Sequence, residues 1–443
     1  MRVGTHYVEG RKLAFFVGEQ VVLFSAFVVA SLAVAYTIGR APHRLLLLTE
    51  AAVTTVSLQI GLYLADLYDF KVAYEDARDH RRLLRTLGSV TIVCALGLLL
   101  LPGPGPSRFA AMAGLGGACT MALAMRAALP ELGYRVALRA RVFLVGQGHA
   151  ASVLMKEVHR DGHAEVVGYA TNDTVGLAEK ARTAGAETIV VATDDRRGLN
   201  VRELLGCRLA GLEVITAITF CERVLRKLPV ELTKPSDLVF SDGFERSRLV
   251  LMVRRLVSLL TALVLFTLAL PILIVTACLI KLDSRGPLFY TQERVGADGK
   301  PFRMLKFRTM RTDAESAGRA QWAQKNDPRV TRVGKWLRRF RVDELPQILN
   351  VIKGEMGVVG PRPERPEFVA KLKTQIPYYD LRALVPPGIT GWAQIRYPYA
   401  ASLEEAREKL QYDLYYVKHL SVHLDLLILF HTAKVVLFGR GAR

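Results

Sequence analysis

Two adjacent carboxylates, Asp343 and Glu344, lie in a basic stretch that begins with Arg338 and ends at Gln347. A carboxylate can attack phosphorus as a nucleophile, and a neighbouring carboxylate can hold a divalent metal ion. Guanidinium groups beside them suit the binding of phosphate oxygens. An Asp-Glu pair near arginines is more often a solvated ion-pair surface. The pair therefore indicates phosphoryl chemistry only if the surrounding sequence supports it.

The composition is both apolar and basic. The chain has 443 residues, of which 51 % are hydrophobic, and a formal net charge of +19. Such a basic excess is typical of proteins that bind nucleic acid, anionic lipid or phosphate-rich substrates. No zinc-finger, RNA-binding or basic-zipper signature accompanies it, so we expect no nucleic-acid partner. From residue 245 onward there are 33 Lys and Arg against 18 Asp and Glu, which a membrane surface or a phosphorylated ligand would favour.

Apolar segments dominate residues 1–132 and predict a bundle of four transmembrane helices. They lie at about 13–37, 45–65, 87–101 and 109–129. The third segment is short, so its helix is expected to begin before residue 87. Basic residues gather before the first segment, between the second and third, and after the fourth. The positive-inside rule therefore places the N-terminus and everything after residue 130 in the cytoplasm.

Residues 133–240 alternate apolar strands with helical stretches, which predicts a Rossmann-like α/β domain. A buried strand at 142–145 leads into a Gly-x-Gly turn at 146–148, where Ala151 replaces the third glycine of a dinucleotide-binding motif. No acidic residue is fixed at the diagnostic position of that motif, and Asp173 is the nearest candidate. Two interpretations stay open: a nucleotide site, or a degenerate domain used for regulation or assembly. The lack of Tyr-x-x-x-Lys in this region argues against a short-chain dehydratase or epimerase.

Residues 256–280 carry no charge and include Pro271 past their middle. The segment is long enough to span a bilayer, yet basic residues flank both of its ends. Because basic flanks favour the cytoplasm and proline bends a helix, we interpret about 250–281 as a re-entrant helix that dips into the membrane and returns. A spanning helix would instead place the basic residues that follow on the outer side.

Further motifs surround the Asp343-Glu344 pair. They are, in order, Gln292–Gly296, Lys306–Met310, Val358–Glu364, Pro387–Gln394 and Tyr412–Tyr416. These blocks, in this order, resemble the bacterial sugar transferases of exopolysaccharide biosynthesis, which are monotopic polyprenyl-phosphate hexose-1-phosphate transferases. The resemblance extends to the long form with four N-terminal membrane helices. It implies that residues 245–443 comprise the re-entrant helix and a mainly α-helical catalytic domain at the membrane interface.

The resemblance implies an enzyme of the bacterial inner membrane, with its catalytic domain on the cytoplasmic face. Such an enzyme transfers a sugar-1-phosphate from a nucleotide diphosphate sugar, usually UDP-linked, to undecaprenyl phosphate and releases UMP. The product starts exopolysaccharide or O-antigen synthesis. The implied route passes through a covalent aspartyl phosphosugar intermediate, which predicts ping-pong kinetics. Membrane lipids are further expected partners, and a homodimer and downstream glycosyltransferases are candidates.

The resemblance also assigns roles to residues of this sequence. The implied catalytic residues are Asp343 as nucleophile, Glu344, Lys306 and Arg338. The Asp343-Glu344 pair would hold Mg²⁺, a hard cation that prefers oxygen ligands. The implied substrate-binding residues are Arg362 with its neighbours Pro361 and Pro363, Arg308 and Asp425. Pro271 matches the proline that breaks the re-entrant helix, although Leu270 stands where the family often has Ser.

The sequence leaves the sugar open. Many small family members have an Asn-Gly-Arg-type loop after the position of Gln394, whereas this chain departs from that pattern over 395–400. The departure is closer to the exopolysaccharide-type branch, which favours UDP-glucose or UDP-galactose as donor. A competing hypothesis is a non-catalytic membrane scaffold or sensor in a polysaccharide assembly complex. A third is a membrane-tethered nucleotide-sugar dehydratase, which a requirement for NAD would reveal.

Overall fold

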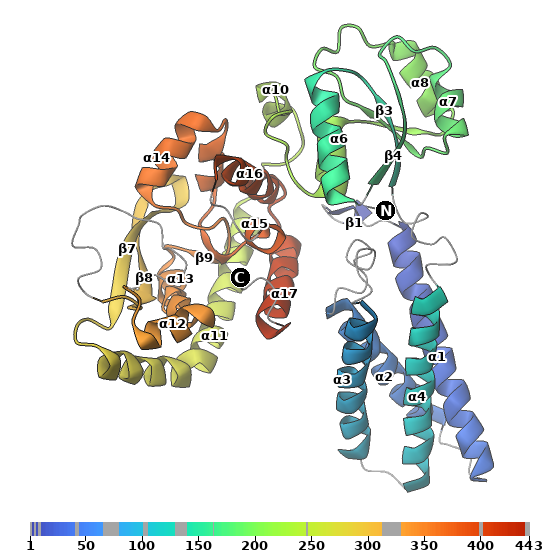
Figure 1. Ribbon diagram of the computed structural model, residues 1–443, viewed down its shortest axis with the longest axis vertical. Helices are drawn as coiled ribbons and strands as arrows, with labels where there is room; N and C mark the ends of the chain where they lie inside the picture. The colour runs from blue at the N-terminus through green and yellow to red at the C-terminus, as the bar shows by residue number, and fades with distance from the viewer. Residues whose placement is uncertain are drawn as a thin grey trace. The chain divides into compact units, whose positions relative to one another are not determined.

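The chain forms two units, Met1–Ala217 and Ile218–Arg443, and Figure 1 shows the fold of each in a computed structural model. The structure describes residues 2–3, 6–7, 10–39, 44–64, 79–100, 105–128, 140–162, 164–244, 247–311, 329–397 and 402–438. The first unit contains long apolar helices and a small parallel sheet. The second unit is mainly helical and includes two short two-stranded sheets.

Four long helices follow a short pair of antiparallel strands, β1 (Arg2–Val3) and β2 (His6–Tyr7). The helices are α1 (Gly10–Thr37), α2 (Arg44–Leu64), α3 (Asp79–Leu100) and α4 (Gly105–Ala128). They pack around a shared core that includes Phe27 and Leu115. Helix α4 approaches α1 closely, since a Cβ atom at Gly117 would lie 2.7 Å from the Cβ of Ala30. The four N-terminal helices predicted from the sequence are confirmed.

Four of the described helices contain an apolar stretch long enough to cross a membrane. These stretches are Ala14–Thr37 in α1, Arg44–Leu64 in α2, Arg108–Met125 in α4, and the whole of α11 (Arg248–Asp283). Helix α3 has a shorter apolar stretch, Leu83–Gly97, in keeping with the short third segment in the sequence. Because about 20 apolar residues span the hydrocarbon core of a bilayer, these helices indicate a membrane protein.

The rest of the first unit is a four-stranded parallel sheet with the strand order β4-β3-β5-β6. Its strands are β3 (Ala140–Val145), β4 (Ala164–Ala170), β5 (Thr188–Val191) and β6 (Glu213–Thr216). The connecting helices are α6 (His149–Asp161), α7 (Leu177–Thr183) and α8 (Val201–Leu209). The predicted alternation of strands and helices is therefore confirmed. Apolar side chains such as Phe143 and Ile189 form the core of this sheet.

The Gly-x-Gly turn between β3 and α6 holds a carboxylate of the chain itself. Asp194 accepts hydrogen bonds from the backbone amides of His149 and Ala150, at 2.8 and 3.0 Å. A Cβ atom at Gly148 would collide with the same carboxylate, so the glycine permits the close approach. The amides at a helix N-terminus are where a dinucleotide phosphate would bind. Because Asp194 takes that position, the arrangement favours the degenerate interpretation of this domain.

The second unit begins within α9 (Ala217–Phe220) and continues through one π-helical turn, η2 (Cys221–Leu225), and α10 (Pro235–Val239) to α11. An antiparallel hairpin, β7 (Phe289–Val295) and β8 (Pro301–Phe307), follows α11, with the short turn η3 (Ala297–Gly299) at its tip. Then come α12 (Arg332–Arg339), η4 (Val342–Glu344), α13 (Gln347–Lys353), β9 (Gly357–Val359), α14 (Pro366–Gln375), η5 (Tyr379–Leu384), β10 (Gly388–Thr390), α15 (Trp392–Arg396), α16 (Leu403–Lys418) and α17 (Val422–Phe438). Strands β9 and β10 pair in parallel.

Helix α11 contacts the folded domain at both of its ends. Near its start, Arg255 donates hydrogen bonds to the carbonyls of Val351 and Ile352, at 2.6 and 2.9 Å. At its end, Asp283 accepts a hydrogen bond from the amide of Val333 at 3.2 Å. Pro271 lies inside the helix, and Figure 1 shows the α11 ribbon changing direction along its length. Proline removes a backbone donor and bends a helix, which lets both ends reach one domain.

Candidate active site

The Asp343-Glu344 pair lies in η4, a single 3₁₀ turn between α12 and α13. After α12 ends, Arg341 reverses the chain in a left-handed conformation with φ of 57°. The following Val342 packs against a core that includes Leu337 of α12. The turn is thus fixed on its apolar side, and Asp343 is only 9 % exposed. The carboxylate pair is therefore fixed in position and largely shielded from solvent, next to the basic helix α12.

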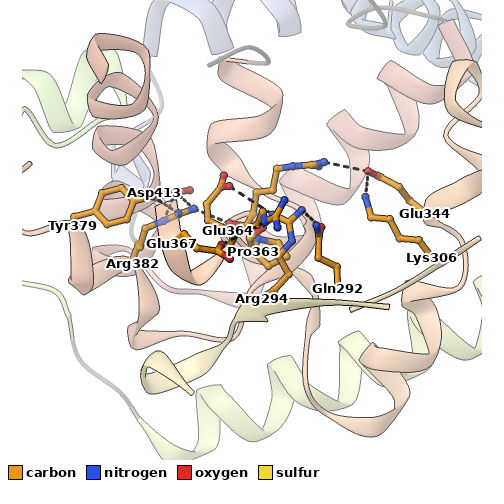
Figure 2. Close-up of polar contacts among 12 residues, drawn as sticks. Gln292, Arg294, Lys306, Glu344, Pro363, Glu364, Glu367, Tyr379, Arg382 and Asp413 are labelled. Atoms are coloured by element: carbon orange, nitrogen blue, oxygen red, sulfur yellow. Dashed lines mark hydrogen bonds and ion pairs between the residues drawn. The ribbon is translucent and has the colours of Figure 1, made fainter. Parts of the chain in front are cut away.

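Three cations converge on one oxygen of Glu344. Lys306 Nζ from β8 lies 3.2 Å from Oε1, and Arg362 Nη2 lies 3.1 Å from the same atom. Arg341 Nη1 lies 3.6 Å away. Figure 2 shows Lys306 and Glu344 facing one another. Lys306 is 18 % and Glu344 15 % exposed, whereas Arg341 is 60 % exposed, so the Lys306 pair is the better sheltered from solvent.

Burial and charge shift the pKa values of this cluster in opposite directions. Burial raises the pKa of Glu344, but Arg362, Lys306 and Arg341 outweigh it and lower that pKa to about 2. Burial lowers the pKa of Lys306 more than Glu344 raises it. Burial and the negative charge of Glu344 raise the pKa of Asp343 against the effect of nearby cations. A carboxylate that is less well stabilised as an anion is the more reactive nucleophile.

Arg338 and Arg308 occupy different environments. Arg338 Nε donates to Thr309 Oγ1 at 2.9 Å, and its charge lowers the pKa of Asp343, which places it beside the cluster. Arg308 is 6 % exposed, and its guanidinium donates to the carbonyls of Arg285 and Ser284 at 2.6 and 2.8 Å. Arg308 therefore caps the carboxyl end of α11, and its predicted role in substrate binding stays a prediction.

Among the hydrogen bonds and ion pairs of the described residues, Asp425 pairs with Arg254 of α11 rather than with the cations around Glu344. Arg254 Nε lies 2.7 Å from Asp425 Oδ2, and the Tyr416 hydroxyl lies 2.7 Å from Oδ1. Asp425 is 6 % exposed. The structure thus gives this carboxylate a buried structural partner, and substrate binding by Asp425 stays a prediction.

Pro361 and Pro363 flank Arg362 in the turn that follows β9. The Arg362 guanidinium reaches Glu344, while the backbone of the turn accepts hydrogen bonds from the side chains of Arg294 and Arg382. These two arginines were not predicted from the sequence as site residues. Their only signal was position, since Arg294 belongs to one of the motifs and Arg382 lies five residues before another.

The carboxylate pair also suits a divalent cation. In the part of the chain that the structure describes, no group of three or more His, Cys, Asp or Glu side chains forms a metal site. Mg²⁺, however, is commonly held by one or two carboxylates together with water and substrate phosphates. Asp343 and Glu344 supply adjacent oxygen donors of this type. The residues present therefore fit Mg²⁺ shared with a phosphorylated substrate.

Comparison with known proteins places these residues in one matched segment. The sequence model of the bacterial sugar transferase family matches residues 249–439. Over 250 residues, 56 % of this chain, the sequence is 41 % identical to the UDP-N-acetylgalactosamine-undecaprenyl-phosphate N-acetylgalactosaminephosphotransferase of Aeromonas hydrophila. Over 189 residues, 41 % of this chain, it is 44 % identical to the undecaprenyl-phosphate glucose phosphotransferase of Komagataeibacter xylinus. The chain spans 58 % of the first relative and 36 % of the second.

A smaller relative is covered more completely. The chain is 50 % identical, over 138 residues or 31 % of its length, to a Bacillus subtilis protein. That protein is described as a putative undecaprenyl-phosphate N-acetylgalactosaminyl 1-phosphate transferase, and the match spans 76 % of it. The segment matched by the family, residues 249–439, contains the carboxylate pair and its cations.

Proposed function

The chain belongs to the bacterial sugar transferase family, and from this premise we propose that it transfers a sugar-1-phosphate from a nucleotide diphosphate sugar to undecaprenyl phosphate. The products would be an undecaprenyl-diphosphate sugar and UMP. The observation that carries the proposal is the convergence of Lys306, Arg362 and Arg341 on Glu344, directly beside the buried Asp343. Cations gathered at a carboxylate nucleophile supply what phosphoryl transfer demands, since the developing negative charge must be stabilised.

In the proposed first step, the Asp343 carboxylate attacks the sugar-linked phosphorus. A bond forms between a carboxylate oxygen and phosphorus, and the bond from that phosphorus to the bridging oxygen of UMP breaks. UMP leaves with the electron pair. In the second step an oxygen of undecaprenyl phosphate attacks the same phosphorus, and Asp343 leaves as a free carboxylate. Splitting the transfer in this way lets one site serve a soluble donor and a lipid acceptor in turn.

The cations have the same task in both steps. Phosphorus surrounded by anionic oxygens repels a carboxylate, so Lys306 and Arg362 must neutralise those oxygens. Glu344 Oε1 lies 3.2 Å from Lys306 and 3.1 Å from Arg362, and an incoming diphosphate would share these two cations with it. Asp343 and Glu344 would hold Mg²⁺, which when bound supplies further charge neutralisation at the phosphate oxygens. Arg338, beside Asp343, would contribute to the same positive field.

We also propose that α11 is re-entrant and that the second unit lies on the cytoplasmic face of the bacterial inner membrane. The supporting observation is that the polar side chains of Arg255 and Asp283, near opposite ends of α11, both bind the same domain. A helix that crossed the bilayer would separate these ends by the hydrocarbon thickness of about 30 Å. The proposed location also gives the site access to nucleotide-activated sugars and to membrane lipid.

The sugar is the finer part of the proposal. The related proteins bear names that specify N-acetylgalactosamine phosphate in some cases and glucose phosphate in others. The departure of the sequence from the Asn-Gly-Arg-type loop favours glucose or galactose. The experiment is UMP release by the purified full chain with Mg²⁺ and undecaprenyl phosphate, across UDP-glucose, UDP-galactose and UDP-N-acetylgalactosamine.

Turnover with one sugar that stops when lipid is withheld or EDTA is added would support the reaction. No UMP from any sugar, with a folded protein and metal present, would favour the alternative of a scaffold or sensor in a polysaccharide assembly complex.

A further inference from the structure

The turn that carries Arg362 is fixed at both of its ends by backbone hydrogen bonds. The carbonyl of Pro361 accepts a hydrogen bond from the amide of Gly388 at 2.9 Å. The carbonyl of Glu364 accepts one from the amide of Val295 at 3.0 Å. The two donors come from β10 and β7, which lie on separate segments of the domain. The turn is therefore attached to strands of two different sheets.

Two arginine side chains hold the middle of the same turn. Arg382 Nη2 donates to the carbonyl of Arg362 at 2.8 Å, and Arg294 Nη1 donates to the carbonyl of Pro363 at 3.1 Å. Each of the four consecutive carbonyls from 361 to 364 thus accepts a hydrogen bond from a different residue. Proline restricts the backbone on both sides of Arg362. With each of these carbonyls bonded to a separate donor, the backbone on either side of Arg362 is fixed in position.

Arg382 is itself held rigidly. Its Nε and Nη2 atoms lie 3.1 and 2.9 Å from Asp413 Oδ2, and its Nη1 donates to the Tyr379 hydroxyl at 2.9 Å. The side chains of Arg382 and Asp413 are 12 % and 5 % exposed. Figure 2 shows Asp413, Tyr379 and Arg382 grouped at one end of the polar network, with Glu344 and Lys306 at the other. A guanidinium carries five donors in a fixed fork, and here the fork binds the Asp413 carboxylate, the Tyr379 hydroxyl and the Arg362 carbonyl together.

A buried ion pair is weak evidence for stability, because desolvation offsets much of the attraction. The pair of Arg382 and Asp413 is better explained by what else it touches. We propose that Arg382, oriented by Asp413, is a positioning residue that fixes the backbone of Arg362. The guanidinium of Arg362 is thereby held at Glu344 and at the phosphate site before substrate arrives. The catalytic consequence rests on the proposed function, in which Arg362 binds the diphosphate of the donor.

Two features of the proposal can be measured separately. Arg382 acts only through Arg362, so its loss should matter little once Arg362 is gone. The positioning itself is visible in the backbone, since a loosened turn would release the amides of Gly388 and Val295 to exchange with solvent. The first feature is tested by activity, and the second needs no substrate.

The test compares Arg382→Lys and Asp413→Asn with Glu408→Gln in the full chain. Glu408 is a matched control because it is also a buried carboxylate of α16, paired with Lys227 Nζ at 2.9 Å. We expect Arg382→Lys and Asp413→Asn to lower kcat/KM for the UDP-sugar by about 10- to 100-fold, since small misplacements of substrate-binding groups have effects of this size. The kcat/KM of Glu408→Gln should stay within about threefold of the wild-type value, even if its melting temperature falls as far as those of Arg382→Lys and Asp413→Asn.

The double variant Arg362→Met with Arg382→Lys should be no more than about threefold worse than Arg362→Met alone. Additive losses, or full activity of Arg382→Lys, would overturn the proposal. Peptides that contain the amides of Gly388 and Val295 should exchange hydrogen faster in Arg382→Lys and at the wild-type rate in Glu408→Gln. Unchanged exchange in Arg382→Lys would refute the positioning role even if no sugar nucleotide proves to be a substrate, whereas failure of wild type to release UMP would count only against the proposed function.

Discussion

Lys306 and Arg341 both pair with Glu344, but they differ in their exposure to solvent. That difference predicts losses of activity of different size for two similar substitutions. Lys306→Met and Arg341→Met each remove one cation that lies beside the same oxygen, Glu344 Oε1. Lys306 lies 3.2 Å from that oxygen and is 18 % exposed, whereas Arg341 lies 3.6 Å away and is 60 % exposed. We expect the first substitution to impair catalysis severely and the second only slightly.

The magnitudes follow from Coulomb's law. At an effective dielectric constant of about 20 the Lys306–Glu344 attraction is about 5 kcal/mol, while in bulk water the Arg341–Glu344 attraction is about 1 kcal/mol. Because Lys306 is sheltered from solvent, its attraction to the phosphate of a bound substrate is strengthened in the same way. Removing one preorganised group that stabilises an anionic transition state lowers kcat by about 100- to 1,000-fold. We therefore expect a loss of that size for Lys306→Met and less than about tenfold for Arg341→Met.

Stability should respond differently from activity. Burial lowers the pKa of Lys306 despite its pairing with Glu344, so the desolvation cost of the ammonium group offsets much of the attraction. Glu344 also keeps Arg362 at 3.1 Å when Lys306 is removed. The free energy of unfolding should therefore change by no more than about 2 kcal/mol.

The assay is steady-state UMP release at saturating Mg²⁺, together with the thermal unfolding midpoint of each variant. Equal losses of activity in Lys306→Met and Arg341→Met, or retention of more than a tenth of wild-type kcat by Lys306→Met, would refute the reasoning.

Three further predictions concern other carboxylates. Asp343→Asn should abolish UMP release while leaving the unfolding midpoint close to wild type, and more than a few per cent of residual activity would exclude Asp343 as the nucleophile. Asp425→Asn should lower the free energy of unfolding by about 3 kcal/mol, because it leaves the buried Arg254 without a charged partner; an unchanged midpoint in thermal denaturation would contradict this. Asp194→Ala should destabilise the first unit by about 1 kcal/mol, because the amides at the start of α6 lose their hydrogen-bond acceptor. Addition of NAD should not stabilise the wild-type chain in the same assay. A rise in its unfolding midpoint with NAD would contradict the degenerate interpretation.

Much of the active-site cluster could be predicted from short motifs. Lys306 and Arg362 are 38 and 18 residues away from Glu344 in the sequence, yet both reach its Oε1 atom. Both residues were selected because the motifs that contain them resemble those of the bacterial sugar transferases. The strands of the parallel sheet and the four N-terminal helices were also predictable, because apolar periodicity reports directly on burial.

The remaining contacts depend on tertiary packing that local sequence does not encode. Arg308 lies in the same motif as Lys306, but β8 ends at Phe307, and the guanidinium of Arg308 binds the end of α11 instead. Asp425 contacts Arg254, although the two residues are 171 positions apart in the sequence. Arg382 contacts the backbone carbonyl of Arg362, and a carbonyl has no sequence signature at all.

The central claim is that Asp343 becomes covalently bonded to the sugar phosphate. The most direct measurement is mass spectrometry of the intact chain and of its peptides, after brief mixing with the donor UDP-sugar and Mg²⁺ in the absence of undecaprenyl phosphate. We predict an added mass of one sugar phosphate on the peptide that contains Asp343, which disappears when lipid is added and never forms in Asp343→Asn. Catalytic turnover in the presence of lipid without any adduct, or an adduct on a peptide that lacks Asp343, would contradict the account.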